Sequence, residues 1–210
     1  MSDHVPVISY AAELRRKALH LLALAIPAGM LLLGREVSVL VLVPLAVVAL
    51  AADWSRHRIR WAREILHRLF APLMRPEEIP PFGGPVVFNG ATMMCTAAAI
   101  SIVLFSAPLA AVALAMQMTG DAAAALVGRP LGNTKWPGSP KSVEGTVAFA
   151  VVAGLVGWAF AQWPGVEVTL AQIIVGAVVA ALVELLPIPV NDNLRVPLAA
   201  ALAMLAVAMV

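Results

Sequence analysis

The segment GDAAAALVGRPLGNTKWPGSPKSVEG, residues 120–145, determines how the rest of the chain is interpreted. It places five glycines, two acidic residues and three cations between two long apolar runs. Glycines let a backbone approach a ligand closely, and the exposed amides of such loops form concavities that bind anions. The segment therefore indicates a phosphate-handling loop at a membrane surface.

The composition is that of a membrane protein. Of the 210 residues, 61% are hydrophobic and 12% are charged, and the mean hydropathy is +0.92. Soluble domains carry about 25% charged residues. The length predicts one polytopic membrane domain over residues 1–210. A net charge of +2 argues against nucleic acid as a partner, and the single Cys95 excludes an intramolecular disulfide.

The hydrophobic pattern predicts an all-α bundle of about seven transmembrane helices. Apolar runs of this length must satisfy their own backbone hydrogen bonds in lipid, and helices do so. The expected spans are residues 18–34, 37–52, 86–106, 108–127, 146–163, 168–186 and 194–210.

The distribution of lysine and arginine predicts the orientation. With a cytoplasmic amino terminus, 13 of the 14 Lys and Arg residues fall on the cytoplasmic side, and Arg35 falls on the other. Such an excess is typical of cytoplasmic loops. The sequence therefore predicts a bacterial inner-membrane protein with its amino terminus and active site in the cytoplasm and its carboxyl terminus outside.

The loop at residues 53–85 begins with an expected amphipathic helix over residues 53–70, lying in the headgroup plane. Its arginines act either as a positive-inside anchor or as a basic floor that attracts anionic lipid or nucleotide. Just beyond the loop, Asn89 either hydrogen-bonds a neighbouring helix or lines a site.

In this topology, acidic and basic side chains share the cytoplasmic face. The carboxylates are those of Asp121, Glu144, Glu184 and Asp192. The cations beside them are Arg16, Lys17, Lys135 and Lys141. Carboxylates bind Mg²⁺ together with phosphate oxygens, and lysines neutralise a transferring phosphoryl group. This pattern indicates Mg²⁺-dependent phosphoryl or nucleotidyl transfer, although the segment lacks the spacing of a Walker A loop.

Three segments together resemble one enzyme family. Residues 120–145 follow the spacing GD-x6-G-x3-G-x2-K-x5-KS-x-EG. Residues 13–20, ELRRKALH, resemble an RK-x-x-H element, and residues 184–197, ELLPIPVNDNLRVP, resemble an E…DN…P element. The order of these elements resembles that of the dolichol kinase, phytol kinase and CTP-dependent diacylglycerol kinase family across essentially the whole chain.

The resemblance implies a kinase that transfers a phosphoryl group from CTP, with Mg²⁺ or another divalent cation, to the hydroxyl of a lipid alcohol. The alcohol would be an isoprenoid, such as phytol or a polyprenol, or diacylglycerol. The implied catalytic residues are Asp121, Lys141 and Glu144, and the implied metal ligands are Asp121, Glu184 and Asp192. The implied phosphate-binding residues are Arg16, Lys17, Gly128, Gly132, Lys135, Ser142 and Gly145. Further site candidates are His20, Asn89 and Asn193.

The sequence departs from the family pattern at Ala125, where many members carry a second acid. Either Glu184 or Asp192 replaces that acid, or metal use differs. Two other functions stay open. One is CDP-lipid synthesis, as in phosphatidate cytidylyltransferases, which needs the same metal and lipid access. The other, which Ala125 allows, is a catalytically inactive lipid-binding or transport protein. Structural roles also stay open, namely an ion pair for Asp121, headgroup-level packing for His20 and a helix cap for residues 191–193.

Overall fold

The structure is a computed structural model that describes residues 18, 21–70, 74 and 76–209. Within these residues the regular elements are helices. They are α2 (Ala25–Arg58), α3 (Arg60–Phe70), the 3₁₀ helix η2 (Pro76–Glu78), α4 (Gly90–Leu104), α5 (Ala107–Gly128), α6 (Val143–Ala161), α7 (Leu170–Leu185) and α8 (Asp192–Ala208).

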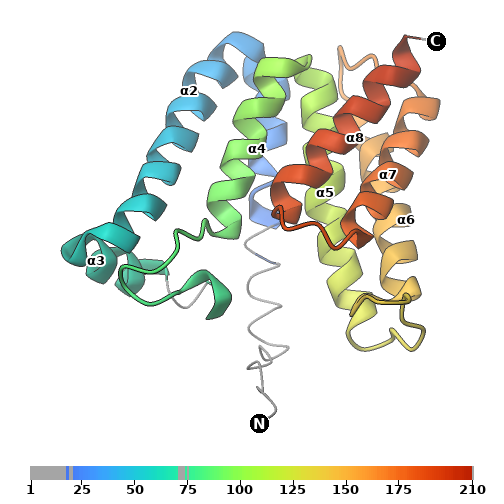
Figure 1. Cartoon of the computed structure of the whole chain (residues 1–210). Helices are drawn as coiled ribbons and strands as arrows, with labels where there is room; N and C mark the ends of the chain where they lie inside the picture. The colour runs from blue at the N-terminus through green and yellow to red at the C-terminus, as the bar shows by residue number, and fades with distance from the viewer. Residues whose placement is uncertain (1–17, 19–20, 71–73, 75, 210) are drawn as a thin grey trace.

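Helix α2 is broken at Gly34, where the backbone is not helical (φ 73°, ψ 177°). The chain rises to this point and descends after it (Figure 1). The descending leg runs beside α4, because Arg35 donates hydrogen bonds to the carbonyl oxygens of Ile102 (3.2 Å) and Val103 (2.7 Å). The two legs correspond to the two runs expected at residues 18–34 and 37–52.

Helix α5 is the centre of the bundle and contacts α2, α4, α6, α7 and α8. In α5, 67% of the most apolar 18-residue stretch is buried, whereas the corresponding share is 22% in α2 and 28% in α6. The first half of α5 is rich in alanine, and Ala110, Ala111 and Ala113 are fully buried. Small side chains let neighbouring helices approach closely, which is how helices associate in lipid.

The connections divide between two ends of the bundle (Figure 1). One end, called the loop end here, carries α3, the segment leading from α3 to α4, and residues 129–142 and 186–191. The opposite end carries the break at Gly34, the short α4–α5 connection, residues 162–169 and the last turn of α8. The polar segment at residues 129–142 therefore lies on the same side as the basic helix α3.

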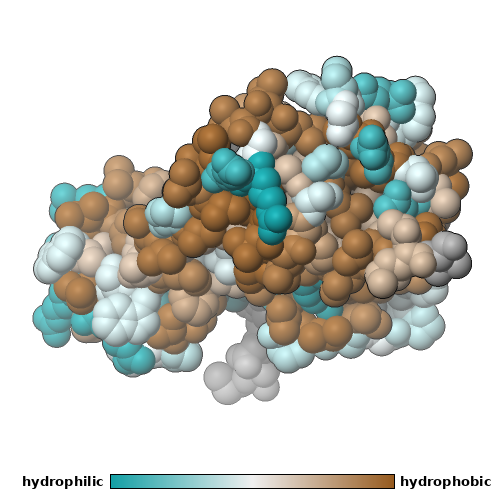
Figure 2. Space-filling model, turned by 90° about the horizontal axis from the view of Figure 1, so that it is seen from above, coloured by the Kyte–Doolittle hydropathy of each residue, from teal (hydrophilic) through white to brown (hydrophobic). Residues whose placement is uncertain are grey.

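The outer surface is largely apolar. Large hydrophobic side chains are exposed on the outward faces of several helices, including Leu40 (74%), Val48 (64%) and Leu155 (61%). Seen from the end opposite the loop end, hydrophobic residues cover most of the surface, and hydrophilic residues form small separate patches (Figure 2). Helices α2, α5 and α6 are long and apolar enough to cross a membrane. This is an all-helical membrane protein.

The amphipathic segment differs from the single helix expected over residues 53–70. Residues 53–58 continue α2, Ile59 is extended (φ −124°, ψ 117°), and a separate α3 follows. The break lets Asp53 and Arg56 turn inward and become buried, while Trp61 and Leu69 on α3 remain exposed. The amphipathic character expected for the segment is thus confined to α3.

We expect Gly34→Ala to destabilise the protein by about 1–2 kcal/mol, because a Cβ atom is disfavoured at positive φ. Space is not the cause, since nothing lies within 4 Å of a Cβ built at Gly34. Gly29→Ala is the matched control: it is equally uncrowded and has no positive φ, so alanine should leave stability unchanged or raise it. Thermal unfolding in detergent measures both, and equal behaviour of the two variants would contradict the assigned turn.

Candidate functional site

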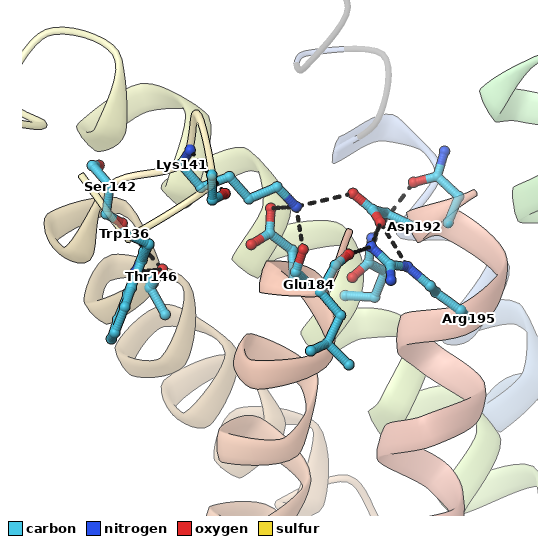
Figure 3. Close-up of polar contacts among 11 residues, drawn as sticks. Trp136, Lys141, Ser142, Thr146, Glu184, Asp192 and Arg195 are labelled. Carbon is cyan, nitrogen blue, oxygen red and sulfur yellow. Dashed lines mark hydrogen bonds and ion pairs between the residues drawn. The ribbon is translucent and has the colours of Figure 1, made fainter. Parts of the chain in front are cut away.

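The Lys141 side chain joins the loop at residues 129–142 to the ends of α7 and α8 (Figure 3). Its ammonium nitrogen lies 2.7 Å from Glu184 Oε1 and 3.3 Å from Asp192 Oδ2. It also donates to the main-chain carbonyl of Glu184, near the carboxyl end of α7, where a positive charge is favourable. An ammonium group has three donors, so all three are engaged here.

Asp192 is held by Arg195 as well, because residues three apart on a helix face the same side. Arg195 Nε lies 2.8 Å from Asp192 Oδ1, and Arg195 Nη2 donates to the carbonyl of Leu186 (2.7 Å). Asn191 caps α8 by accepting from the amide of Asn193 (3.0 Å). The cap, an acid in the first turn and Arg195 therefore fix the start of α8 beside Lys141.

The glycines of the segment at residues 120–145 allow main chain to lie against main chain where α5 meets α6. A Cβ atom at Gly132 would come 2.1 Å from the Gly128 carbonyl oxygen and 2.4 Å from Ser142 Oγ. Ser142 caps α6 by accepting from the amide of Gly145 (3.1 Å). Gly128, Gly132, Ser142 and Gly145 thus form one compact corner that sets the position of Lys141.

Beyond this corner the loop folds back on itself. Lys135 and Ser142 form an isolated antiparallel bridge, and a turn at residues 136–139 places Gly138 at φ 72°. The Trp136 indole donates to Thr146 Oγ1 (3.0 Å), and Glu144 accepts from the amide of Thr134 (3.0 Å). Glu144 therefore supports the loop backbone, and Lys135 is exposed.

Asp121 lies on α5 and acts electrostatically on Glu184, as do Asp192 and Lys141. One turn earlier on α5 is Gln117, whose amide nitrogen lies 3.5 Å from Asn193 Oδ1. Asn193 in turn donates to the carbonyl of Gly90 at the start of α4 (2.9 Å). The inner side of the site therefore contains Asp121, Gln117 and Asn193, contributed by α5 and α8.

Asn89 belongs to a neighbouring polar group at the loop end. It caps α4 by accepting from the amide of Thr92 (2.9 Å), and its own side-chain amide donates to Asp53 Oδ1 (2.9 Å). Arg56, 1% exposed, also binds Asp53 (2.6 Å) and donates to the carbonyls of Glu78 and Val87. These bonds hold residues 78–89 against α2. In the structure, Asn89 thus contacts a neighbouring helix through Asp53.

Apart from Asn89 and Asn193, whose contacts are given above, the residues expected to form the site fall into three sets. Lys141, Glu184 and Asp192 are in direct contact, and Asp121 is within electrostatic range of Glu184. Gly128, Gly132, Ser142, Gly145, Glu144 and Lys135 shape the loop. Arg16, Lys17 and His20 lie outside the described residues.

Sequence reasoning missed two residues. Arg195 could have been predicted from the sequence, because it follows Asp192 by three positions in an expected helix. Gln117 could also have been predicted, since an amide in an otherwise apolar helix, one turn from Asp121, is an unusual polar group at membrane depth.

The carboxylates of Glu184 and Asp192 could supply some, but not all, of the ligands of a magnesium ion. Among residues 18, 21–70, 74 and 76–209, no group of three or more His, Cys, Asp or Glu side chains is placed to hold a metal. Mg²⁺, however, is commonly held by one or two carboxylates together with substrate phosphates. Glu184 and Asp192 share Lys141 and supply two such carboxylates. The two carboxylates are of the type that Mg²⁺ uses together with phosphate oxygens.

Comparison with known proteins gives two relatives. An uncharacterized protein of Rickettsia prowazekii (strain Madrid E) is 27% identical over 188 residues, which cover 89% of this chain and 90% of that protein. Phytol kinase 1, chloroplastic, of Arabidopsis thaliana is 34% identical over 110 residues, covering 46% of this chain and 35% of the kinase. The chain thus spans about a third of the plant enzyme. No family model and no solved structure matches.

We expect Lys141→Met to destabilise the protein by about 1–3 kcal/mol, because it leaves a buried carboxylate without its donor. The Glu184 side chain is 9% exposed and depends on this ammonium. The double variant Lys141→Met/Glu184→Gln should recover most of the loss. Lys135→Met, at an exposed lysine of the same loop, is the control and should unfold like the parent. Thermal unfolding in detergent distinguishes these results, and a wild-type midpoint for Lys141→Met would contradict the ion pair.

Proposed function

We propose that the protein is a CTP-dependent kinase of membrane lipid alcohols, with its site at the loop end of the bundle. The observation that carries this proposal is the contact of Lys141 with Glu184 and Asp192, which lie 43 and 51 positions later in the chain, within electrostatic range of Asp121. The similarity to a plant phytol kinase supports a lipid alcohol as the acceptor. The acceptor class is an isoprenoid alcohol such as phytol or a polyprenol, or diacylglycerol.

The proposed topology has seven spans in one domain: the two legs of α2 and helices α4–α8. The basic residues of α3, of residues 129–142 and of the start of α8 lie at the loop end, and Arg35 lies at the opposite end. Following the positive-inside rule, we propose that the loop end faces the cytoplasm and that the membrane is a bacterial inner membrane. A lipid hydroxyl at headgroup depth would approach the site from the bilayer.

In the proposed reaction the alcohol oxygen forms a bond to the γ-phosphorus of CTP. The bond from that phosphorus to the β–γ bridging oxygen breaks, and CDP leaves. The hydroxyl proton passes to the Asp121 carboxylate, which acts as general base. Charge builds up on the phosphoryl oxygens during transfer, so nearby cations promote the reaction.

Lys141 provides such a cation when its partners change. In the structure its three donors bind Glu184 and Asp192. We propose that these two carboxylates hold a magnesium ion when nucleotide binds, which leaves the ammonium group for phosphate oxygens. The bound metal would supply further neutralisation of the phosphates. The compact corner of Gly128, Gly132, Ser142 and Gly145 holds the backbone of Lys141 in place while its side chain changes partners.

The test is a transfer assay on purified protein with γ-³²P-labelled CTP or ATP, Mg²⁺ and a panel of phytol, geranylgeraniol, undecaprenol and diacylglycerol. We expect label in one lipid with CTP, and a loss of about 100-fold or more with Asp121→Asn because the base is removed. Glu167→Gln, an exposed carboxylate in the connection at the opposite end, is the control and should retain activity.

Other outcomes would overturn the kinase assignment. Pyrophosphate released in the presence of phosphatidic acid, with CMP attached to the lipid, would identify a cytidylyltransferase. No turnover in either assay would identify a lipid-binding protein without catalysis. Normal transfer by Asp121→Asn would remove the proposed base.

A further inference from the structure

Gln117 is a buried polar side chain with an unused hydrogen-bond acceptor. It is 2% exposed, and its Oε1 atom has no hydrogen-bond partner in the part of the chain that the structure describes. Buried polar groups are nearly always paired, because an unpaired one loses its water without compensation. The unpaired Gln117 Oε1 atom is therefore explained if a bound ligand donates a hydrogen bond to it.

The orientation of the Gln117 amide follows from its neighbour. Asn193 donates through Nδ2 to the Gly90 carbonyl, which can only accept, so Asn193 Oδ1 faces Gln117. Gln117 must therefore turn its NH₂ group toward Asn193 and its oxygen away. The open position at Gln117 is thus an acceptor, which selects a ligand that donates a hydrogen bond.

The position of Gln117 points to the ligand. Gln117 and Asp121 are four residues apart on α5, and such side chains are neighbours on one face, with Cβ atoms about 5–6 Å apart. A single oxygen atom between them can reach both. The Gln117–Asn193 contact is 3.5 Å long, at the limit for a hydrogen bond, so it opens at little cost when a ligand enters.

We propose that Gln117 binds the hydroxyl group of the lipid alcohol, accepting its hydrogen bond through Oε1 and holding the alcohol oxygen beside Asp121. This proposal rests on the proposed function. An alcohol has one hydroxyl proton, so it donates either to Gln117 or to Asp121. Gln117 accepts it in the resting complex, and the proton turns to Asp121 as the oxygen–phosphorus bond forms. The contact with Gln117 is therefore made before the reaction rather than in the transition state.

The decisive measurement is binding of radiolabelled phytol and of phytyl methyl ether to protein in nanodiscs without nucleotide. The ether lacks the donor, so the wild type should bind phytol about five- to tenfold more tightly than the ether. Gln117→Met keeps the side-chain size and removes both polar atoms, and it should bind the two ligands equally. In turnover it should raise KM for the alcohol and kcat by a similar factor, so that kcat/KM for the alcohol and KM for CTP stay within about twofold of wild type, because the lost contact is made before the transition state and not in it.

The matched control is Thr119→Val, a second buried polar residue of α5 whose hydroxyl already donates to the Ala115 carbonyl (2.8 Å). It should keep the preference for phytol. Thermal unfolding checks the fold: Gln117→Met should unfold within about 1 kcal/mol of wild type, because it removes an unpaired buried acceptor but also the long hydrogen bond to Asn193 Oδ1.

The outcomes separate the two proposals. A preference for phytol that is lost in Gln117→Met, but without transfer of label, would uphold the alcohol site and overturn the kinase. Label transfer with an unchanged preference in Gln117→Met would uphold the kinase and overturn the role of Gln117. Equal binding of phytol and its ether by the wild type, or no binding of either, would also overturn it.

Discussion

The ammonium group of Lys141 links the loop at residues 129–142 to the end of α7 and the start of α8, which lie more than 40 residues further along the chain. Two carboxylates near the end of an apolar bundle repel each other and lose hydration, and a cation between them offsets both effects. The Lys141 ammonium group therefore stabilises the approach of the Glu184 and Asp192 carboxylates at the ends of α7 and α8. A charged ligand that competes with Glu184 or Asp192 for Lys141 would therefore change the contacts between the loop and the ends of α7 and α8.

The same constraint explains why the glycines of residues 120–145 are needed even without a ligand. Lys141 reaches Glu184 only if the loop lies tightly against the corner of α5 and α6, and Gly132 permits that contact with the Gly128 carbonyl. A motif that resembles a phosphate loop in sequence is thus also a packing motif. Both roles place the same residues under constraint, since a displaced backbone would move the lysine away from its carboxylates.

Local patterns in the sequence predicted local structure well. The break between residues 34 and 37, the limits of α5 and the caps around Ser142 and Asn191 all follow from apolar runs, glycines and capping residues. Contacts between distant segments did not follow in the same way. The pairing of Asn89 with Asp53 and the approach of Gln117 to Asn193 depend on how helices rotate against one another. Rotation is set by packing of small side chains such as Ala110 and Ala111, which periodicity alone does not resolve.

The lengths of the helices have a consequence for the surrounding lipid. Helices α4, α7 and α8 have 15, 16 and 17 residues, or about 22–26 Å at 1.5 Å per residue. The hydrocarbon core is about 30 Å thick, so these helices are too short for it, whereas α5 with 22 residues is not. At the loop end, α7 and α8 stop short of the level that α5 and α6 reach (Figure 1). We expect the bilayer to thin on this side through hydrophobic mismatch, which would bring headgroups and water to the level of Asp192.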